Sequence, residues 1–133
     1  MKTLLNLLVG GLLAVSVAAA QEKPAAPTNA NLKVEKAVAA TSVENREPVG
    51  ESAEFEATVG TVSCWTKISA KSVPATIKHV WYLGDQQVFE KALDIKFPST
   101  RTWSSKSVKT GSWRVDVTDD AGTVLTSVSF TVK

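Results

Sequence analysis

Two stretches of the chain, Thr61-Val-Ser-Cys-Trp-Thr-Lys-Ile68 and Ile77-Lys-His-Val-Trp-Tyr-Leu83, decide the fold. Both are rich in β-branched and aromatic residues, and the connection between them ends at Pro74, which breaks a strand. They are therefore predicted to be two neighbouring strands. Together they hold the only cysteine, histidine and tyrosine of the chain and two of its four tryptophans. We expect any functional site to include or border this pair.

The first 20 residues have the pattern of a secretory signal peptide. Lys2 is followed by the apolar run 4–17 and by small residues that end at Ala20. The apolar run is shorter than the roughly 20 residues that a membrane-spanning helix needs. We therefore predict cleavage after Ala20, a periplasmic or secreted protein, and no stable membrane insertion after cleavage.

Charge and cysteine content narrow the classes of function. The full chain has a formal net charge of +2, and loss of Lys2 with the signal peptide lowers it to +1. This balance indicates no nucleic-acid partner, which would need a basic patch. A single cysteine cannot form an internal disulfide, so packing must supply the stability.

The rest of the chain is predicted to be a linker followed by one β domain. Residues 21–33 carry prolines without apolar periodicity and are expected to be a flexible linker, and residues 34–133 are expected to form the domain. The alanines of the run 33–43 would also suit a helix, but the run is predicted to be an edge strand, and 44–50 is predicted to be a loop. The alternation in 54–59 predicts a strand with Phe55, Ala57 and Val59 on one face.

Two strand registers remain open after Gly60. If the alternation continues, Trp65 and Lys67 face the core. If Gly60 marks a bulge, the residues that turn inward are Val62, Cys64, Thr66 and Ile68.

Further strands follow at short intervals. A turn at Gly84-Asp85 is followed by Gln87–Phe89 and then by Leu93, Ile95 and Phe97 in alternation. A polar strand over 101–108 carries Trp103. The segments 112–117 and 124–132 are predicted to form an antiparallel hairpin whose inward residues are Trp113, Val115, Val117, Val124, Val128, Phe130 and Val132.

The count of strands indicates the fold class. Seven to eight short strands separated by turns, with no long helix, are typical of an all-β antiparallel sandwich of immunoglobulin-like type. The two-cysteine bridge of immunoglobulin domains is missing. A small β-barrel is the alternative fold.

Several motifs in order also resemble a bacterial family catalogued as domain of unknown function 2914. They are Asn45-Arg-Glu-Pro48, Cys64-Trp-Thr-Lys-Ile68, His79-Val-Trp-Tyr82, Arg101-Thr-Trp-Ser-Ser-Lys106, Gly111-Ser-Trp-Arg-Val-Asp-Val117, Gly122-Thr-Val-Leu125 and Phe130-Thr-Val132. The resemblance runs from about Val34 to Lys133. It implies a single compact domain in a bacterial envelope setting, and it assigns no activity to any residue.

Chemistry-bearing residues are few. Cys64 and His79 lie in the predicted neighbouring strands, and a thiol–imidazole nucleophile pair is the most specific enzymatic hypothesis. Without a third ligand they do not make a metal site, and a buried thiol beside a hydrogen-bonded imidazole is the alternative interpretation. Glycine-rich phosphate loops and the serine-hydrolase elbow are absent from the sequence, so no cofactor is predicted.

The tryptophans indicate a binding surface. Trp103 stands in a strand that is otherwise polar, where it either fills the core, as large aromatic residues usually do, or faces solvent. Exposed tryptophan beside cations suits a sugar, a peptide strand or another protein. The candidate binding residues are Trp65, Lys67, His79, Trp81, Arg101 and Trp103.

Three functions follow from these features. The first is a non-catalytic interaction module of the cell envelope, whose partner is an envelope protein or a glycan. The second is a small thiol-dependent enzyme that uses Cys64 and His79. The third is a structural envelope subunit, and the oligomeric state is left open.

Overall fold

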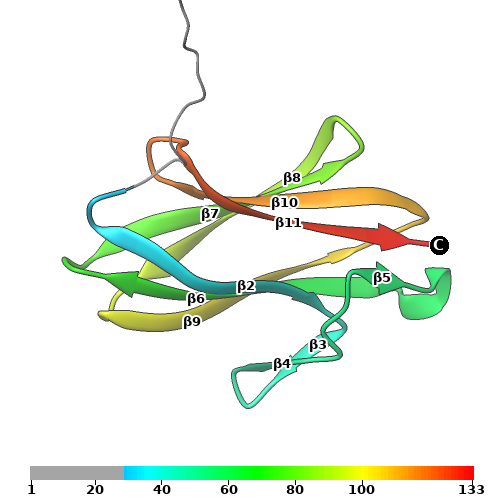
Figure 1. The fold of residues 1–133 in the computed structure, drawn as a ribbon, viewed down its shortest axis with the longest axis horizontal. Coiled ribbons are helices and arrows are strands. Elements are labelled where there is room, and N and C mark those ends of the chain that lie inside the picture. Colours follow the sequence, from blue (N-terminus) through cyan, green and yellow to red (C-terminus); the bar gives the residue numbers. More distant parts are fainter. Residues whose placement is uncertain (1–28) are drawn as a thin grey trace, which may run out of the picture.

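The computed structural model describes residues 29–133, so the predicted signal peptide and most of the predicted linker lie outside the described residues. Strand labels follow Figure 1. Seven strands have nine or ten residues: β2 (Leu32–Ala40), β6 (Thr61–Ala70), β7 (Ala75–Leu83), β8 (Gln86–Ile95), β9 (Ser99–Ser107), β10 (Gly111–Asp119) and β11 (Val124–Val132). Three are shorter: β3 (Ser42–Glu44), β4 (Glu47–Val49) and β5 (Glu54–Phe55).

The strands form two layers (Figure 1). One sheet has the order β5-β11-β10-β7-β8 and the other has the order β2-β6-β9. Among the seven long strands, the first, second and fifth thus make one sheet and the remaining four make the other, which is an immunoglobulin-like arrangement. The predicted all-β sandwich is confirmed. The barrel alternative is wrong, because neither of these sheets closes on itself in the described part of the chain.

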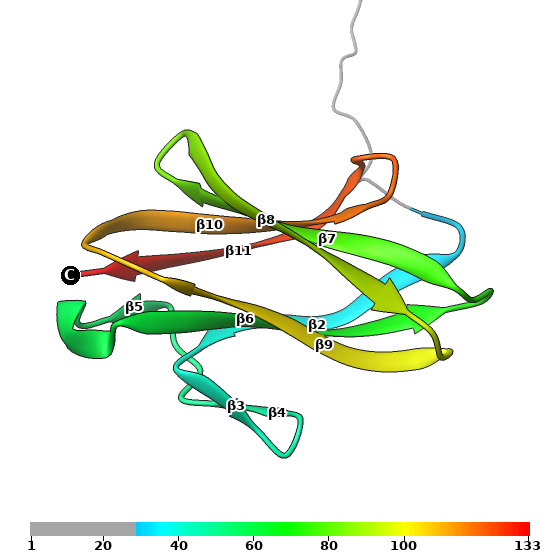
Figure 2. The same ribbon diagram turned by 180° about the vertical axis from the view of Figure 1, so that it is seen from behind.

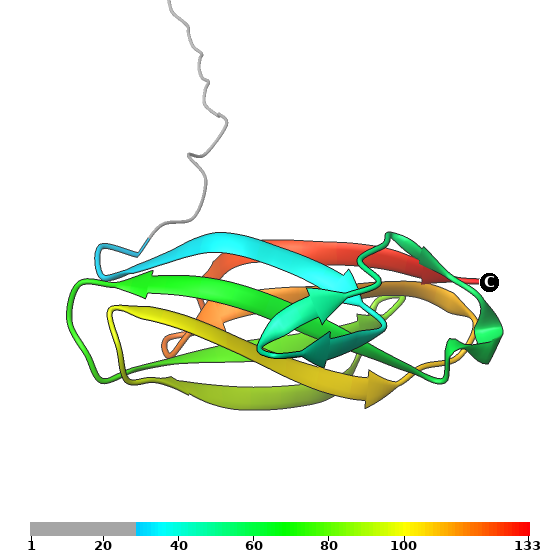
Figure 3. The same ribbon diagram turned by 90° about the horizontal axis from the view of Figure 1, so that it is seen from below.

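The hairpin β3–β4 was not predicted. Its strands pair only with each other, and the hairpin lies outside the layer formed by β2, β6 and β9 (Figures 2 and 3). The segment was expected to be a loop because Pro48 interrupts it. A two-stranded ribbon of three residues per strand nevertheless forms around the tip residues Asn45 and Arg46, whose φ angles of 53° and 65° are those of a tight hairpin turn.

The strand predicted over 54–59 is only partly right. Glu54 and Phe55 pair in parallel with β11, after which a 3-10 turn, η2 (Ala57–Val59), ends the extended backbone. Phe55 is buried, whereas Ala57 is exposed. The turn ends at Gly60 with φ of 76°, so the alternation does not pass through this residue.

The core lies between the two sheets in two apolar clusters. The first gathers Ala39, Phe55, Val62, Cys64, Trp81, Trp113, Val115, Phe130 and Val132, and the second gathers Leu32, Ile68, Ala70, Ile77, Ile95 and Val117. In the first cluster the rings of Trp113 and Phe130 stack with centroids 6.0 Å apart, and Trp81 meets both rings edge-on. Aromatic contacts of this geometry stabilise a small core beyond the area they bury.

Two predicted inward residues lie elsewhere. Phe97 follows the end of β8 and is 64% exposed in the β8–β9 connection. The pairing of β10 with β11 shifts register between Val117 and Thr118, and Leu125, the neighbour of Val124, packs against the second cluster. A β-bulge of this kind reverses which residues face inward. In residues 29–133 no helix has the length and apolar character to cross a membrane.

Candidate functional site

The outer face of the three-stranded sheet carries most of the predicted binding residues. In β6, the residues that face the core are Val62, Cys64, Thr66 and Ile68, all without exposed surface. The second of the two registers left open by the sequence is therefore correct. Trp65 and Lys67 point to the opposite side of the sheet, away from β7 and β10.

Antiparallel pairing aligns these residues with others in two rows across β2, β6 and β9. Lys67 lies opposite Lys36 on one side and opposite Arg101 on the other. In the adjoining row, Trp65 lies opposite Trp103. We call the surface formed by these five residues the basic–aromatic face.

The cationic row is electrostatically unfavourable for the sheet itself. Like charges directly opposite each other on neighbouring strands destabilise an antiparallel sheet. Lys36 is compensated by Glu51, with 3.3 Å between Nζ and Oε2, and Arg101 is compensated by Glu47. Lys67, in the middle of the row, is exposed and forms no ion pair with any residue in the range 29–133.

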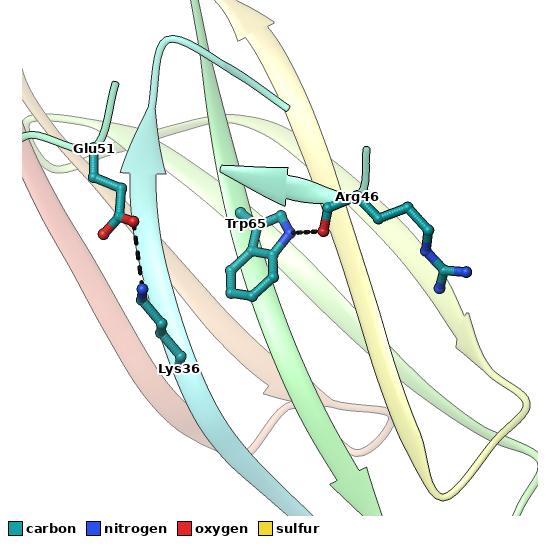
Figure 4. A network of polar contacts seen from close by, with 4 residues as sticks. All are labelled: Lys36, Arg46, Glu51 and Trp65. Carbon is teal, nitrogen blue, oxygen red and sulfur yellow. Dashed lines mark hydrogen bonds and ion pairs between the residues drawn. The ribbon is translucent and has the colours of Figure 1, made fainter. Parts of the chain in front are cut away.

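Trp65 is covered by the β3–β4 hairpin. Its indole Nε1–H donates to the carbonyl oxygen of Arg46 at 3.0 Å, and the side chain is only 2% exposed (Figure 4). Lys36 lies on the other side, with Nζ 5.9 Å from the centre of the ring. The hydrogen bond ties the hairpin tip to the indole ring, and the cation–π contact helps to keep the ring in place on the sheet.

Trp103 differs from the other three tryptophans. The indole N–H groups of Trp65, Trp81 and Trp113 all donate to protein acceptors. Trp103 is partly exposed, and its indole N–H has no acceptor among the described residues. Its ring thus offers both an apolar surface and a free donor on the basic–aromatic face.

The structure places His79 and Trp81 in the core, apart from the other four predicted binding residues. Both are without exposed surface, and Trp65 beneath the hairpin is 2% exposed, so a ligand on the outside of the domain would touch none of these three predicted residues. Trp81 Nε1–H donates to Ser104 Oγ at 3.0 Å, and Ser104 Oγ lies 2.7 Å from His79 Nδ1. On the other side of the ring, His79 Nε2 lies 3.2 Å from Thr66 Oγ1, which donates to the carbonyl of Thr102 at 2.9 Å.

These hydrogen bonds assign the tautomer of His79. The single hydroxyl proton of Thr66 is committed to a carbonyl, so Thr66 Oγ1 must accept from His79 Nε2–H. Nδ1 is then an acceptor and receives the hydroxyl proton of Ser104. The chain of donors therefore runs in one direction, from Trp81 through Ser104, His79 and Thr66, and links the two sheets with every polar atom satisfied.

Burial also controls the protonation of the two nucleophile candidates. It lowers the pKa of the His79 imidazole from 6.5 to about 4 and raises the pKa of the Cys64 thiol from 9.0 to about 12. Cys64 packs in the first apolar cluster, while both ring nitrogens of His79 are bonded to hydroxyl groups. The geometry thus favours the interpretation of a buried thiol and a hydrogen-bonded imidazole.

Some residues of the site were not predicted. Lys36 and the hairpin carboxylate of Glu47 become part of it only through strand register and hairpin folding. A signal for Lys36 existed, since it lies in the run expected to be an edge strand. Within 29–133, no group of three or more His, Cys, Asp or Glu side chains is arranged to hold a metal ion.

Part of the chain matches a known protein family. The family model described as protein of unknown function (DUF2914) matches residues 74–132, which hold β7 to β11. The resemblance recognised in the sequence is confirmed. Its motifs before Pro74, including the hairpin tip and the Cys64–Ile68 stretch, lie outside the matched segment. No curated protein matches the chain.

Proposed function

We propose that this chain, whose residues 74–132 match a family of proteins of unknown function, is a non-catalytic interaction module of the bacterial cell envelope. It binds an anionic partner, a protein or a glycan, through the basic–aromatic face. The predicted signal peptide supports an exported location, and a β-sandwich with a specialised outer face is a common scaffold for binding.

One observation carries the proposal: Lys67, the exposed cation in the middle of the row, forms no direct ion pair within 29–133. The hydrogen bond from Ser69 is the largest cause of the lowered pKa of the Glu35 carboxyl, and the charge of Lys67 is the smallest. Lys67 is placed between Lys36 and Arg101, and Trp103, in the adjoining row opposite Trp65, is partly exposed. Like charges directly opposite each other destabilise the sheet. A row of like charges that opposes the stability of the sheet is expected at functional or strained sites. An anionic group bound above Lys67 would supply the direct ion-pair partner that Lys67 lacks within 29–133.

The two other functions have less support. A thiol enzyme requires an accessible thiolate, whereas Cys64 is buried with a raised pKa. A structural subunit requires a self-complementary surface, and a cationic row does not pair with its own copy. The basic–aromatic face therefore favours the interaction module.

The binding test uses the indole N–H resonances of the four tryptophans as reporters. The purified protein is titrated with polyglutamate, an anionic polypeptide, and with polygalacturonate, an anionic glycan. We expect at least one of the two to shift the Trp103 resonance, while the resonances of the core residues Trp81 and Trp113 stay in place.

Charge reversal supplies the matched control for this titration. Lys67→Glu should abolish the shift, whereas Lys78→Glu, the same change on the outer side of the other sheet, should leave it intact. The proposal is refuted if neither polymer shifts Trp103, or if both charge variants weaken binding equally.

The export part of the proposal has its own test. The full chain is produced with a C-terminal tag in a bacterial host, and the mature protein is recovered from the periplasm or the medium. We expect its N-terminal sequence to begin at Gln21. An intact Met1 N-terminus in a cytoplasmic fraction would contradict export.

A further inference from the structure

Strand β9 is a sheet edge whose pairing with its neighbour is regular over its whole length. The four outer strands of the two sheets are β5, β8, β2 and β9. Strand β5 has only two residues, and β8 and β2 each carry an irregularity of register. Strand β9 pairs with β6 over nine residues without any shift and contains no proline. Short strands, bulges and prolines are among the devices that protect edges, and β9 has none of them, so the charged side chains of Arg101 and Lys106 are its remaining protection.

The hydrogen-bonding parity of β9 follows from the bonds at its two ends. Ala70 N–H donates to the carbonyl of Pro98, and Val108 N–H donates to the carbonyl of Gly60, both at 2.9 Å. In an antiparallel ladder, pairs with and without hydrogen bonds alternate. The even-numbered residues of β9 therefore bond to β6, and the odd-numbered ones direct their N–H and C=O groups away from it.

These outward backbone groups belong to the residues of the binding face. Arg101, Trp103 and Ser105 are odd-numbered, and their side chains lie on the same outer side as Trp65 and Lys67. Their backbone groups have no partner in the described range 29–133. A strand that pairs with β9 would thus satisfy them and place its own alternate side chains at the end of each row.

The geometry points to an extended acidic peptide segment that adds to β9 as a fourth strand. This inference rests on the proposed function and names the partner class. The peptide residue opposite Arg101 extends the row of three cations and should be acidic. The residue opposite Trp103 extends the aromatic row and should be apolar or aromatic, because cross-strand pairs of this type stabilise a sheet.

Two other segments that could pair with β9, a second copy of this strand and residues 21–28 of the same chain, fit less well. Pairing of β9 with a second copy would bring a second cationic row to the same face, and the carboxylates of Glu47 and Glu51 in that copy are already paired with its own Arg101 and Lys36. The segment 21–28 of the chain itself contains two prolines and a single acidic residue, so it lacks both the donors and the charge.

The test uses a capped peptide whose pattern reads the same in both directions, Thr-Glu-Thr-Phe-Thr-Glu-Thr. Whichever way it runs, Phe lies opposite Trp103 and Glu lies opposite Arg101. Two N-methylated versions accompany it, one methylated at Phe and both Glu residues, and the other at the inner Thr residues. Binding to the purified protein is measured by calorimetry and by the Trp103 indole resonance.

Only one of the two methylated peptides should lose affinity, by about tenfold or more, because only one set of peptide N–H groups points at β9 in a given strand direction. Loss with the Phe and Glu set indicates antiparallel addition, and loss with the Thr set indicates parallel addition. On the protein side, Ser105→Pro should weaken binding and Ser105→Ala should not, since both lose the hydroxyl contact with Ser63 and only proline removes the outward N–H.

The outcomes separate this inference from the proposed function. If the parent peptide binds and the two methylated peptides have equal affinity, strand addition is overturned. In that case, a Trp103 shift by the anionic polymers that depends on Lys67 would still support the proposed function. If the peptide fails and the polymers still shift Trp103, the partner class is wrong and the face stands. If the peptide and both polymers fail, the inference and the proposed function fall together.

Discussion

Mild acid should destabilise this protein through His79 alone. The imidazole has a pKa of about 4 in the folded protein against 6.5 when it is solvated. Between these values the unfolded chain binds a proton that the folded protein does not, so the free energy of unfolding falls as the pH falls. The loss begins near the unfolded pKa and is complete below the folded one.

The magnitude follows from the difference between the two pKa values. A difference of about 2.5 corresponds to a total of about 3 kcal/mol, of which about 2 kcal/mol is lost by about pH 5. The physical cause is the burial of the imidazole, which disfavours its charged form, and the surrounding hydrogen bonds offer no acceptor for a second ring proton. A second ring proton on Nδ1 would meet Ser104 Oγ, which already accepts from Trp81 and whose own proton would lose its acceptor.

The assay is urea unfolding followed by tryptophan fluorescence, at pH values between about 7.5 and 5. Wild type is compared with His79→Gln, which cannot titrate and should show a flat profile from a lower starting stability. The lowered pKa values of Glu35 and Asp119 give stability that is lost only below their ordinary values of 4.5 and 3.8, outside this window. A flat profile in wild type, or an equal slope in the variant, would refute the reasoning.

Three further predictions concern single side chains. Ser104→Ala should lower the free energy of unfolding by about 2–4 kcal/mol, because it leaves Trp81 Nε1–H and His79 Nδ1 buried without partners, and urea titration at neutral pH would measure the loss. Trp65→Phe should release the hairpin tip by removing the bond to Arg46, at a cost of about 1 kcal/mol, seen as faster hydrogen exchange in 42–49 but unchanged exchange in β10. Cys64 should resist a thiol reagent at about pH 8 in the folded protein and react within minutes in urea; rapid labelling without urea would revive the thiol-enzyme hypothesis.

The hairpin of β10 and β11 illustrates where local sequence is sufficient. Trp113, Val115 and Val117 alternate with polar residues, and a short turn leads directly into the returning strand. Both strands are close in the chain, so pairing needs no distant partner. The same reasoning failed over 54–59, where the parallel contact with β11 involves residues that are far away in the sequence.

The same local reasoning predicted only part of the candidate site. Trp65, Lys67, Arg101 and Trp103 were named from residue type and neighbourhood, and the structure brings them to one face. His79 and Trp81 carry the same kinds of side chain but lie in the core. Residue type indicates which groups have binding chemistry, whereas exposure depends on which side of the sheet a strand presents.

The sequence by itself determined the all-β class, the family resemblance and the positions of most long strands, because alternation and turn residues act over a few neighbouring positions. Only the tertiary structure decided the register after Gly60, the row formed by Lys36, Lys67 and Arg101, and the open edge of β9. Each of these depends on pairing between strands that are distant in the chain. A shift of one residue would exchange the core and outer faces of β6, and the alternating pattern fits both registers locally until the opposite sheet and the β3–β4 hairpin select one.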